Sequence, residues 1–265
     1  MRILLAAMTS QKGDVAGNLA QHVALLEQAA TGGCDLAVFP EMSLTGSVDP
    51  TRRPDRLLAE DSAPVLALAR ATGRTGVAAL FGLAERGDVD GGAHISQVFA
   101  RMGEVVGTYR KRHFGDDEDG FTAGGEHVVF EVGAARFGVA ICAEADIDGP
   151  WAAARAAGAD LVCFCAAPGL HGRRTDVDGW RAGHRWWVDH GLGAVRRHAR
   201  RRRLWVAMAT QAGATADEDF PGGAALVDPD GAVTARLPDW RPGTLVVDVP
   251  VPEVPEVPEV PRRSR

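Results

Sequence analysis

The chain has 265 residues, of which 46% are hydrophobic and 24% are charged, and this ordinary globular composition excludes a mostly disordered protein. Its 29 Lys and Arg residues against 35 Asp and Glu residues give a net charge of −6, which argues against a general polyanion binder. No apolar run approaches the ~20 residues that a membrane span needs, and the first residues lack the pattern of a signal peptide. We therefore expect a cytoplasmic protein with no nucleic-acid and no membrane partner.

The first half of the chain alternates short apolar runs with amphipathic stretches. We expect a strand at 3–8, a helix at 18–30, a strand at 34–39, a helix at 63–72 closed by Gly73, and strands at 77–85, 94–102 and 105–111. The helix at 18–30 is expected to bury its apolar face, formed by Leu19, Val23, Leu26 and Ala30.

The second half continues the pattern. We expect strands at 128–133, 134–142 and 159–167, helices at 151–157 and 180–203, and strands at 204–212, 224–231 and 244–250. These mixed αβ and ββ units predict a layered α/β sandwich rather than a pure Rossmann alternation. We expect one domain over 1–249.

The C-terminal segment is different in composition. VPEVPEVPEVP (251–261) repeats every three residues, which is the period of a polyproline II helix. We expect residues 250–265 to form a solvated, extended or disordered tail outside the fold, and a docking strip for a partner is the alternative.

Cysteine and lysine are both scarce. Four cysteines in 265 residues are too few for a disulfide framework, so we expect reduced thiols. Basic residues are almost all arginine, and the lysines are Lys12 and Lys111 alone. A compact ammonium is not interchangeable with a guanidinium, so both lysines are candidates for a special role.

Three predicted strands each end on a reactive side chain. Glu41 follows AVFP, Lys111 follows GTYR and Cys142 follows FGVAI, and the carboxyl ends of strands are where α/β sheets place their chemistry. A thiol becomes a strong nucleophile once a base removes its proton. The oxyanion that forms when a nucleophile attacks an amide is stabilised by a nearby ammonium. The three residues therefore form a consistent set for attack on a carbonyl.

The motifs around these residues resemble the carbon–nitrogen hydrolase (nitrilase) superfamily. They are FPEMSLTG (39–46), GTYRKRHFGDDEDGFTAG (107–124), GVAICAE (138–144), GADLV (158–162) and FPGGAALVDPDGAV (220–233). The resemblance runs from about Arg2 to Val249. It implies a four-layer α-β-β-α sandwich that pairs into a homodimer or a higher homo-oligomer.

The resemblance also implies a mechanism. Glu41 would be the general base, Lys111 the oxyanion stabiliser and Cys142 the nucleophile of a thioacyl intermediate. A second glutamate is expected between the lysine and the cysteine; Glu118 is the first choice and Glu126 the alternative. The implied function is hydrolysis of a non-peptide carbon–nitrogen bond in a small carboxamide or ureido (N-carbamoyl) compound, without metal or organic cofactor. A nitrilase, or a catalytically silent binding or regulatory protein on the same scaffold, is the alternative.

Some positions depart from the family pattern. Ala143 replaces an aromatic residue, Asp146 stands where relatives carry Arg, and Asp148 with Gly149 replaces Pro-Glu. Arginines fill most of 196–203, where relatives have a less basic helix. This run is interpreted as a solvated helix face, with an acidic interface or nucleic-acid binding as alternatives.

Several other side chains have two interpretations. Cys163 and Cys165 are expected to pack in the core or to line a pocket rather than to bind a metal. Trp180, Trp186 and Trp187 are equally consistent with a pocket wall and with packing. Candidates to hold a substrate carboxylate are Arg173, Arg174 and Arg181.

Overall fold

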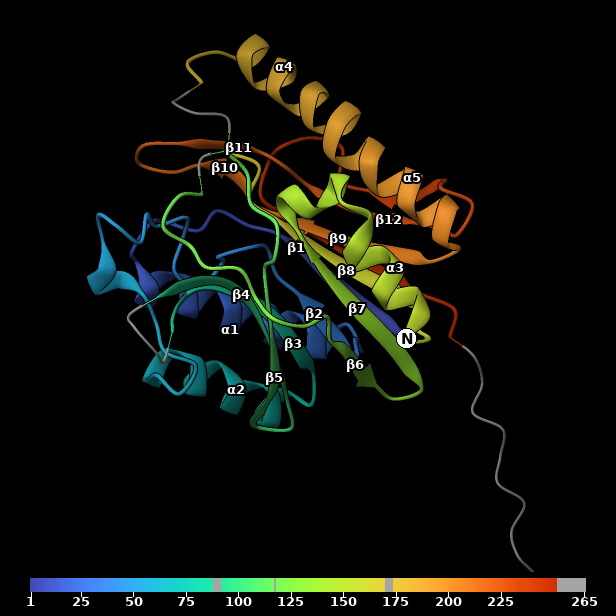
Figure 1. Ribbon diagram of the computed structural model, residues 1–265, viewed down its shortest axis with the longest axis horizontal. Helices are drawn as coiled ribbons and strands as arrows, with labels where there is room; N and C mark the ends of the chain where they lie inside the picture. Colours follow the sequence, from blue (N-terminus) through green and yellow to red (C-terminus); the bar gives the residue numbers. More distant parts are fainter. Residues whose placement is uncertain (88–91, 117, 170–173, 252–265) are drawn as a thin grey trace, which may run out of the picture.

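The computed structural model describes residues 1–87, 92–116, 118–169 and 174–251. Two six-stranded sheets lie face to face, and helices cover the outer face of each (Figure 1). This is the four-layer α-β-β-α sandwich that the sequence predicts.

The first sheet has the strand order β14-β1-β2-β3-β4-β5. Its strands are β1 (Arg2–Ala7), β2 (Leu36–Val38), β3 (Ala78–Arg86), β4 (Ala93–Arg101), β5 (Glu104–Arg110) and β14 (Gly243–Asp248). Strand β1 pairs in parallel with β2 and antiparallel with β14, so the first and last strands of the fold are neighbours. Helices α1 (Val15–Thr31) and α2 (Ala63–Thr75) cover the outer face of this sheet (Figure 1).

The second sheet has the order β13-β12-β9-β8-β7-β6. Its strands are β6 (Val129–Val132), β7 (Ala135–Ile141), β8 (Leu161–Ala166), β9 (Trp205–Thr210), β12 (Ala224–Val227) and β13 (Val233–Arg236). Helices α3 (Asp148–Ala156) and α5 (Gly193–Arg202) lie on its outer side. A π-helical turn, Val188–Leu192, joins α5 to α4 (Val177–Trp187), which extends beyond the end of the sheet (Figure 1). A small ribbon, β10 (Ala212–Ala214) with β11 (Asp219–Pro221), completes the described elements.

Side chains along a strand point alternately to the space between the sheets and to the helices outside. In β1, Ile3 and Leu5 face the other sheet, whereas Leu4 faces the helices, because successive side chains of a strand point to opposite faces. In β8, Cys163 and Cys165 point between the sheets. All four cysteines are free, and the described residues contain no group of His, Cys, Asp and Glu that could hold a metal ion. The expectation of core packing for this cysteine pair is confirmed.

Two helices differ from the prediction. Helix α2 continues past Gly73 to Thr75 and ends at Gly76, which has a φ of 73°. A Cβ at Gly73 would lie 3.1 Å from Gly103 Cα, so this glycine permits a close approach instead of ending the helix. In α1 the fully buried positions include the polar Asn18 and His22, whereas the prediction gave this face only apolar residues.

Those two polar side chains connect α1 to the segment that follows β2. Asn18 Nδ2 donates to Leu44 O at 3.1 Å, and His22 Nε2 lies 2.9 Å from Ser43 Oγ. Buried polar groups without hydrogen-bond partners are costly, so these contacts fix the segment 39–46 against the helix.

None of the helices in the described ranges is long and apolar enough to cross a membrane. Residues 252–265 of the expected tail lie outside the described residues, so the boundary at 249 stays a prediction.

Candidate functional site

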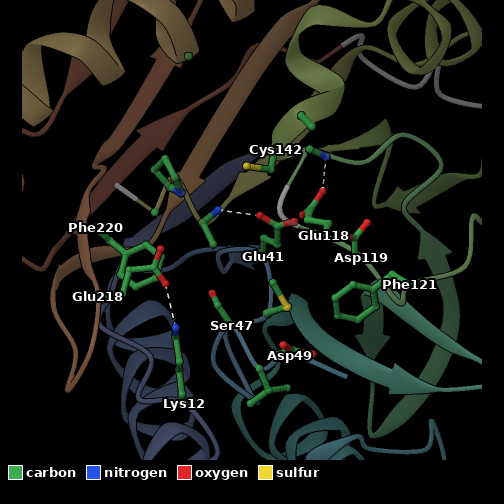
Figure 2. A pocket seen from close by; sticks show the side chains of 18 of the residues that line it. Lys12, Glu41, Ser47, Asp49, Glu118, Asp119, Phe121, Cys142, Glu218 and Phe220 are labelled. Carbon is green, nitrogen blue, oxygen red and sulfur yellow. Dashed lines mark hydrogen bonds and ion pairs between the residues drawn. The ribbon is translucent and has the colours of Figure 1, made fainter. Parts of the chain in front are cut away.

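A cavity of about 880 Å³ opens where segments from both sheets meet. Glu41 and Glu118 come from loops of the first sheet, and Cys142 comes from the end of β7 in the second sheet (Figure 2). The three side chains lie together in the cavity, although 77 or more positions separate Glu41 from the other two in the chain. The structure thus brings together residues that the sequence picked out at separate strand ends.

Glu41 lies in the turn that follows β2, and its side chain is 1% exposed. The Ala167 backbone N–H donates to Glu41 Oε2 at 2.8 Å, and Gln211 Nε2 donates to the Glu41 carbonyl at 3.0 Å. Both donors belong to the second-sheet half of the chain. The position of this carboxylate therefore depends on the packing of one sheet against the other.

Lys111 directly follows β5, and its side chain is fully buried. Its ammonium donates to Glu41 Oε1 at 2.7 Å and also to Glu118 Oε1. Burial alone lowers the pKa of Lys111, but the negative charges of Glu41 and Glu118, and that of Cys142 when it is ionised, outweigh burial and raise this pKa above its usual value. The group is a permanent cation between two carboxylates.

Glu118 completes this arrangement. Its second oxygen accepts a hydrogen bond from Gly115 N at 2.6 Å, and its side chain is 13% exposed. Glu126, the alternative second glutamate, is exposed and is not among the described residues that line the cavity. The geometry therefore groups Glu118, and not Glu126, with Lys111.

Cys142 is the first residue after β7 and opens a short 3₁₀ turn, Cys142–Asp146. Its φ of 42° lies in the left-handed region, which a side-chain-bearing residue occupies only where the surroundings impose it. Burial raises the pKa of the Cys142 thiol well above its usual value; the Glu41 carboxylate adds to this effect, and Lys111 opposes it. The sulfur is consequently a thiol at neutral pH that needs a base.

A base of suitable strength lies beside it. Burial raises the pKa of Glu41 to about 7, and the attraction of Lys111 opposes this rise without cancelling it. A general base is most effective when its pKa is near the working pH. The site therefore combines the protonated thiol of Cys142, the Glu41 carboxyl with a pKa of about 7 and the Lys111 cation.

The structure adds features of the site that the sequence analysis did not identify. The Ala167 amide is one of them, and no pattern in ADLVCFCAA marks it. Lys12 is the second rare lysine, and it lines the cavity with its ammonium 2.9 Å from Glu218 Oε2 (Figure 2). The scarcity of lysine was the available signal for Lys12, but nothing in the sequence indicated its partner.

Some of the aromatic candidates line the cavity, whereas the arginine candidates in the described part of the chain do not. Trp186 and Trp187 line the cavity, and a Cβ at Gly191 would lie 2.2 Å from the Trp187 ring. Trp180 instead stacks on Trp240, with ring centroids 5.8 Å apart. Of the candidate arginines, Arg174 and Arg181 do not line this cavity, and Arg173 lies outside the described residues.

The arginine-rich segment meets carboxylates of its own chain. Arg197 lies 3.2 Å from Asp146 Oδ1, and Arg202 forms an ion pair with Asp148. These acidic residues are two of the departures from the family pattern in the turn after Cys142. The arginine-rich segment therefore has carboxylate partners within its own chain, one in the turn after Cys142 and one at the start of α3.

Comparison with known proteins places the chain in a family. A model of the family described as carbon-nitrogen hydrolase matches residues 3–259. The chain belongs to the carbon–nitrogen hydrolase family. The resemblance found in the sequence is confirmed, and so is the expectation of an enzyme of this hydrolase class.

The fold is also similar to that of solved amidase structures. A variant of the amidase from Nesterenkonia sp. AN1, which shows the Michael addition of acrylamide at its active-site cysteine, superposes with a TM-score of 0.79 at 25% identity and covers 94% of this chain and 93% of its own. The same variant of that amidase, with the acetamide moiety of fluoroacetamide on its active-site cysteine, superposes with a TM-score of 0.80 at 25% identity, with 94% and 90% coverage.

One curated relative is the glutamine-dependent NAD(+) synthetase of Thermotoga maritima. It is 34% identical over 149 residues, which are 54% of this chain and 25% of that enzyme. The chain therefore matches only about a quarter of the length of this relative.

Proposed function

We propose that the chain is a cysteine-dependent amidase that hydrolyses the carbon–nitrogen bond of a small carboxamide or N-carbamoyl compound. The observation that carries the proposal is the Lys111 ammonium, which donates to both the Glu41 and the Glu118 carboxylate, while these two carboxylates lie with Cys142 in the cavity (Figure 2). A buried cation next to a nucleophile and a base is the arrangement that acyl transfer requires.

The proposed reaction has two halves. In the first, Cys142 Sγ attacks the amide carbonyl while Glu41 takes the thiol proton, and Lys111 stabilises the oxyanion. Glu41 then gives the proton to the leaving nitrogen, the carbon–nitrogen bond breaks, and ammonia or an amine departs from a thioester. In the second half, Glu41 takes a proton from water while the water oxygen attacks the thioester, the carbon–sulfur bond breaks, and the acid departs. Glu41 then returns the proton to the Cys142 thiolate, which restores the free thiol. The sum is amide plus water to acid plus amine.

Glu118 is proposed to hold Lys111 in place and to position the water. Its carboxylate reaches the ammonium with one oxygen and the Gly115 amide with the other. A cation shared by two carboxylates stays directed at the place where negative charge develops. Fixed charges of this kind cost no reorganisation during the reaction.

Charge around the cavity favours a carboxamide over an N-carbamoyl acid. The described lining contains seven carboxylates against the cations Lys12 and Arg52; the carboxylates are Glu41, Asp49, Glu118, Asp119, Asp146, Asp217 and Glu218. Both cations are already paired, Arg52 with Asp49 at 3.2 Å and Lys12 with Glu218. A substrate that carries its own carboxylate would meet a negative potential. The adducts named for the Nesterenkonia amidase, from acrylamide and fluoroacetamide, come from uncharged amides of small size.

The proposal is tested by alkylating the four cysteines with iodoacetamide across pH and reading each site by peptide mass spectrometry. Cys142 is expected to react far faster than Cys34, Cys163 and Cys165, since those three are buried in the core. A panel of aliphatic amides, N-carbamoyl amino acids and nitriles, scored by ammonia release, then identifies the substrate class. Turnover of nitriles alone would favour a nitrilase. An inert Cys142 together with a silent panel would favour a binding or regulatory protein.

The pH dependence provides a further prediction. With the pKa of Glu41 raised to about 7, the carboxyl is protonated below that pH and cannot accept the thiol proton. We therefore expect kcat/KM to rise with pH through about 7 on a limb of unit slope, since this parameter reports groups of the free enzyme. Circular dichroism at each pH serves as the control for folding. A flat profile from pH 5 to 8 would contradict the role of Glu41 as base.

Gly82 in β3 gives a prediction about the support beneath Glu41. A Cβ at Gly82 would lie 2.4 Å from Met42 N and 2.6 Å from Pro40 O, both in the turn that carries Glu41. Gly82→Ala is expected to displace this turn, to lower kcat about 10-fold or more, and to destabilise the fold by about 1–3 kcal/mol. Gly125→Ala is the matched control, because its Cβ would enter open space. Equal activity of the two variants would count against the prediction.

The remaining expectations belong to the same proposal. We propose a homodimer or higher homo-oligomer in the cytoplasm, with a small-molecule substrate and no nucleic-acid partner. Sedimentation analysis of the purified chain tests the assembly, and the amide assay with and without a chelator tests the independence from metal.

A further inference from the structure

One fully buried carboxylate near the cavity has no part in the proposed reaction. Glu144 lies in the turn that Cys142 opens and is 0% exposed. Each of its oxygens accepts a backbone hydrogen bond, Oε1 from Arg112 N at 2.9 Å and Oε2 from Ile141 N at 2.8 Å. The Tyr109 hydroxyl lies 2.9 Å from both oxygens. Every partner is a donor, so the site is built for an ionised acceptor.

The residues that donate to Glu144 lie close to Lys111 and Cys142 in the sequence. Tyr109 and Arg112 flank Lys111, and Ile141 immediately precedes Cys142. Strand β5, which leads to Lys111, belongs to the first sheet, whereas β7, which leads to Cys142, belongs to the second. A single carboxylate therefore connects the backbone beside the lysine to the backbone beside the cysteine, across the junction between the sheets.

Glu144 is itself held in place. The Trp151 indole N–H donates to the Glu144 carbonyl at 3.1 Å, and Trp151 is a fully buried residue of α3. The bond to Ile141 N also closes the turn in which Cys142 adopts its φ of 42°. Such a backbone conformation persists only when surrounding contacts determine it.

We propose that Glu144 is a positioning residue, and that its carboxylate clamp sets the placement of the Cys142 thiol relative to the Lys111 ammonium. This inference rests on the proposed function. A misplacement of about 1 Å can cost ~10²-fold in rate, so a clamp between the two groups acts on the chemical step without touching substrate.

The test is Glu144→Gln, which keeps the shape of the side chain. One carboxylate oxygen becomes an NH₂ group that must face a backbone N–H, so the clamp loses one connection. We expect kcat to fall ~10²-fold, with KM changed less than about 3-fold because substrate contacts remain. The rate of Cys142 alkylation by iodoacetamide is expected to fall with kcat.

Two controls separate positioning from stability. Leu68→Ala removes a fully buried side chain of α2 on the far side of the first sheet; it is expected to lower the melting temperature but to leave kcat and alkylation unchanged. Tyr109→Phe removes the hydroxyl donor and leaves both backbone bonds, so a smaller loss of kcat, about 3- to 10-fold, is expected for a hydrogen bond to a charged group.

The outcomes are distinguishable. If Glu144→Gln and Leu68→Ala have the same kcat and the same alkylation rate, the clamp is refuted while the proposed function stands. If Glu144→Gln does not fold, unchanged kcat and alkylation in Tyr109→Phe overturn the inference. A wild-type chain that neither hydrolyses the amide panel nor reacts selectively at Cys142 overturns the proposed function instead.

Discussion

Replacing Cys142 by alanine is expected to abolish hydrolysis of every amide that the wild-type chain turns over, with a loss of at least ~10⁴-fold in kcat. The proposed thioester cannot form without the sulfur, and Glu41 and Lys111 alone do not supply a nucleophile. The measurement is ammonia release at saturating substrate, with the thermal melt as the control for folding.

The chain offers a matched comparison for this variant. Cys34 is buried at 6% exposure and does not line the cavity, so Cys34→Ala removes the same atom from a remote place. It is expected to retain wild-type kcat. Cys142→Ser, which keeps an oxygen of lower nucleophilicity, is expected to resemble Cys142→Ala. Substantial activity in Cys142→Ala would refute the proposed nucleophile.

The second large effect is expected from Glu41→Gln, with a loss of ~10²–10⁴-fold in kcat. The amide oxygen of Gln can still accept from Lys111, but the side chain can no longer take the thiol proton. The measurement is the pH profile of the residual activity, which should lack the acidic limb near pH 7 that we assign to Glu41.

A variant of Glu218, another carboxylate of the cavity, tests whether the removal of a negative charge alone explains the loss of kcat in Glu41→Gln. Glu218 lines the cavity and pairs with Lys12, so Glu218→Gln makes the same chemical change without a proposed proton transfer. We expect its kcat to stay within about 10-fold of wild type, well short of the effect of a lost general base. Equal losses in the two variants would show that Glu41 has no special role as base.

Much of the fold could be predicted because its signals are local. The strands at 3–8 and 159–167 were predicted from their apolar runs, and in the structure the period of two places Leu5 and Cys163 between the sheets. The end of α2 was predicted wrongly at Gly73, because a glycine that admits a neighbouring backbone looks the same in sequence as one that ends a helix. The prediction of the buried face of α1 was incomplete, because Asn18 and His22 are buried and form hydrogen bonds with a turn that is remote in sequence.

Part of the candidate site could also be predicted from the sequence, and part could not. Glu41, Lys111 and Cys142 were predicted from strand ends and motifs; Glu41 and Cys142 line one cavity, and Lys111 is buried directly behind it against Glu41. The Ala167 amide was not predicted, since any residue type supplies a backbone N–H. The partners of Lys12 and Asp146 were not predicted either, because ion pairs between distant segments depend on how the two sheets pack.

The pairing of β1 with β14 has a consequence for biosynthesis. A ribosome delivers β1 first, but its antiparallel neighbour, residues 243–248, is synthesised only after all the other strands of both sheets. The Gln211 side chain that holds the Glu41 carbonyl also comes from this late half. The nascent chain must therefore wait with an open sheet edge, which is a known aggregation liability. The complete site consequently cannot form before residue 211 has been synthesised, and β1 lacks its antiparallel neighbour until β14 is available.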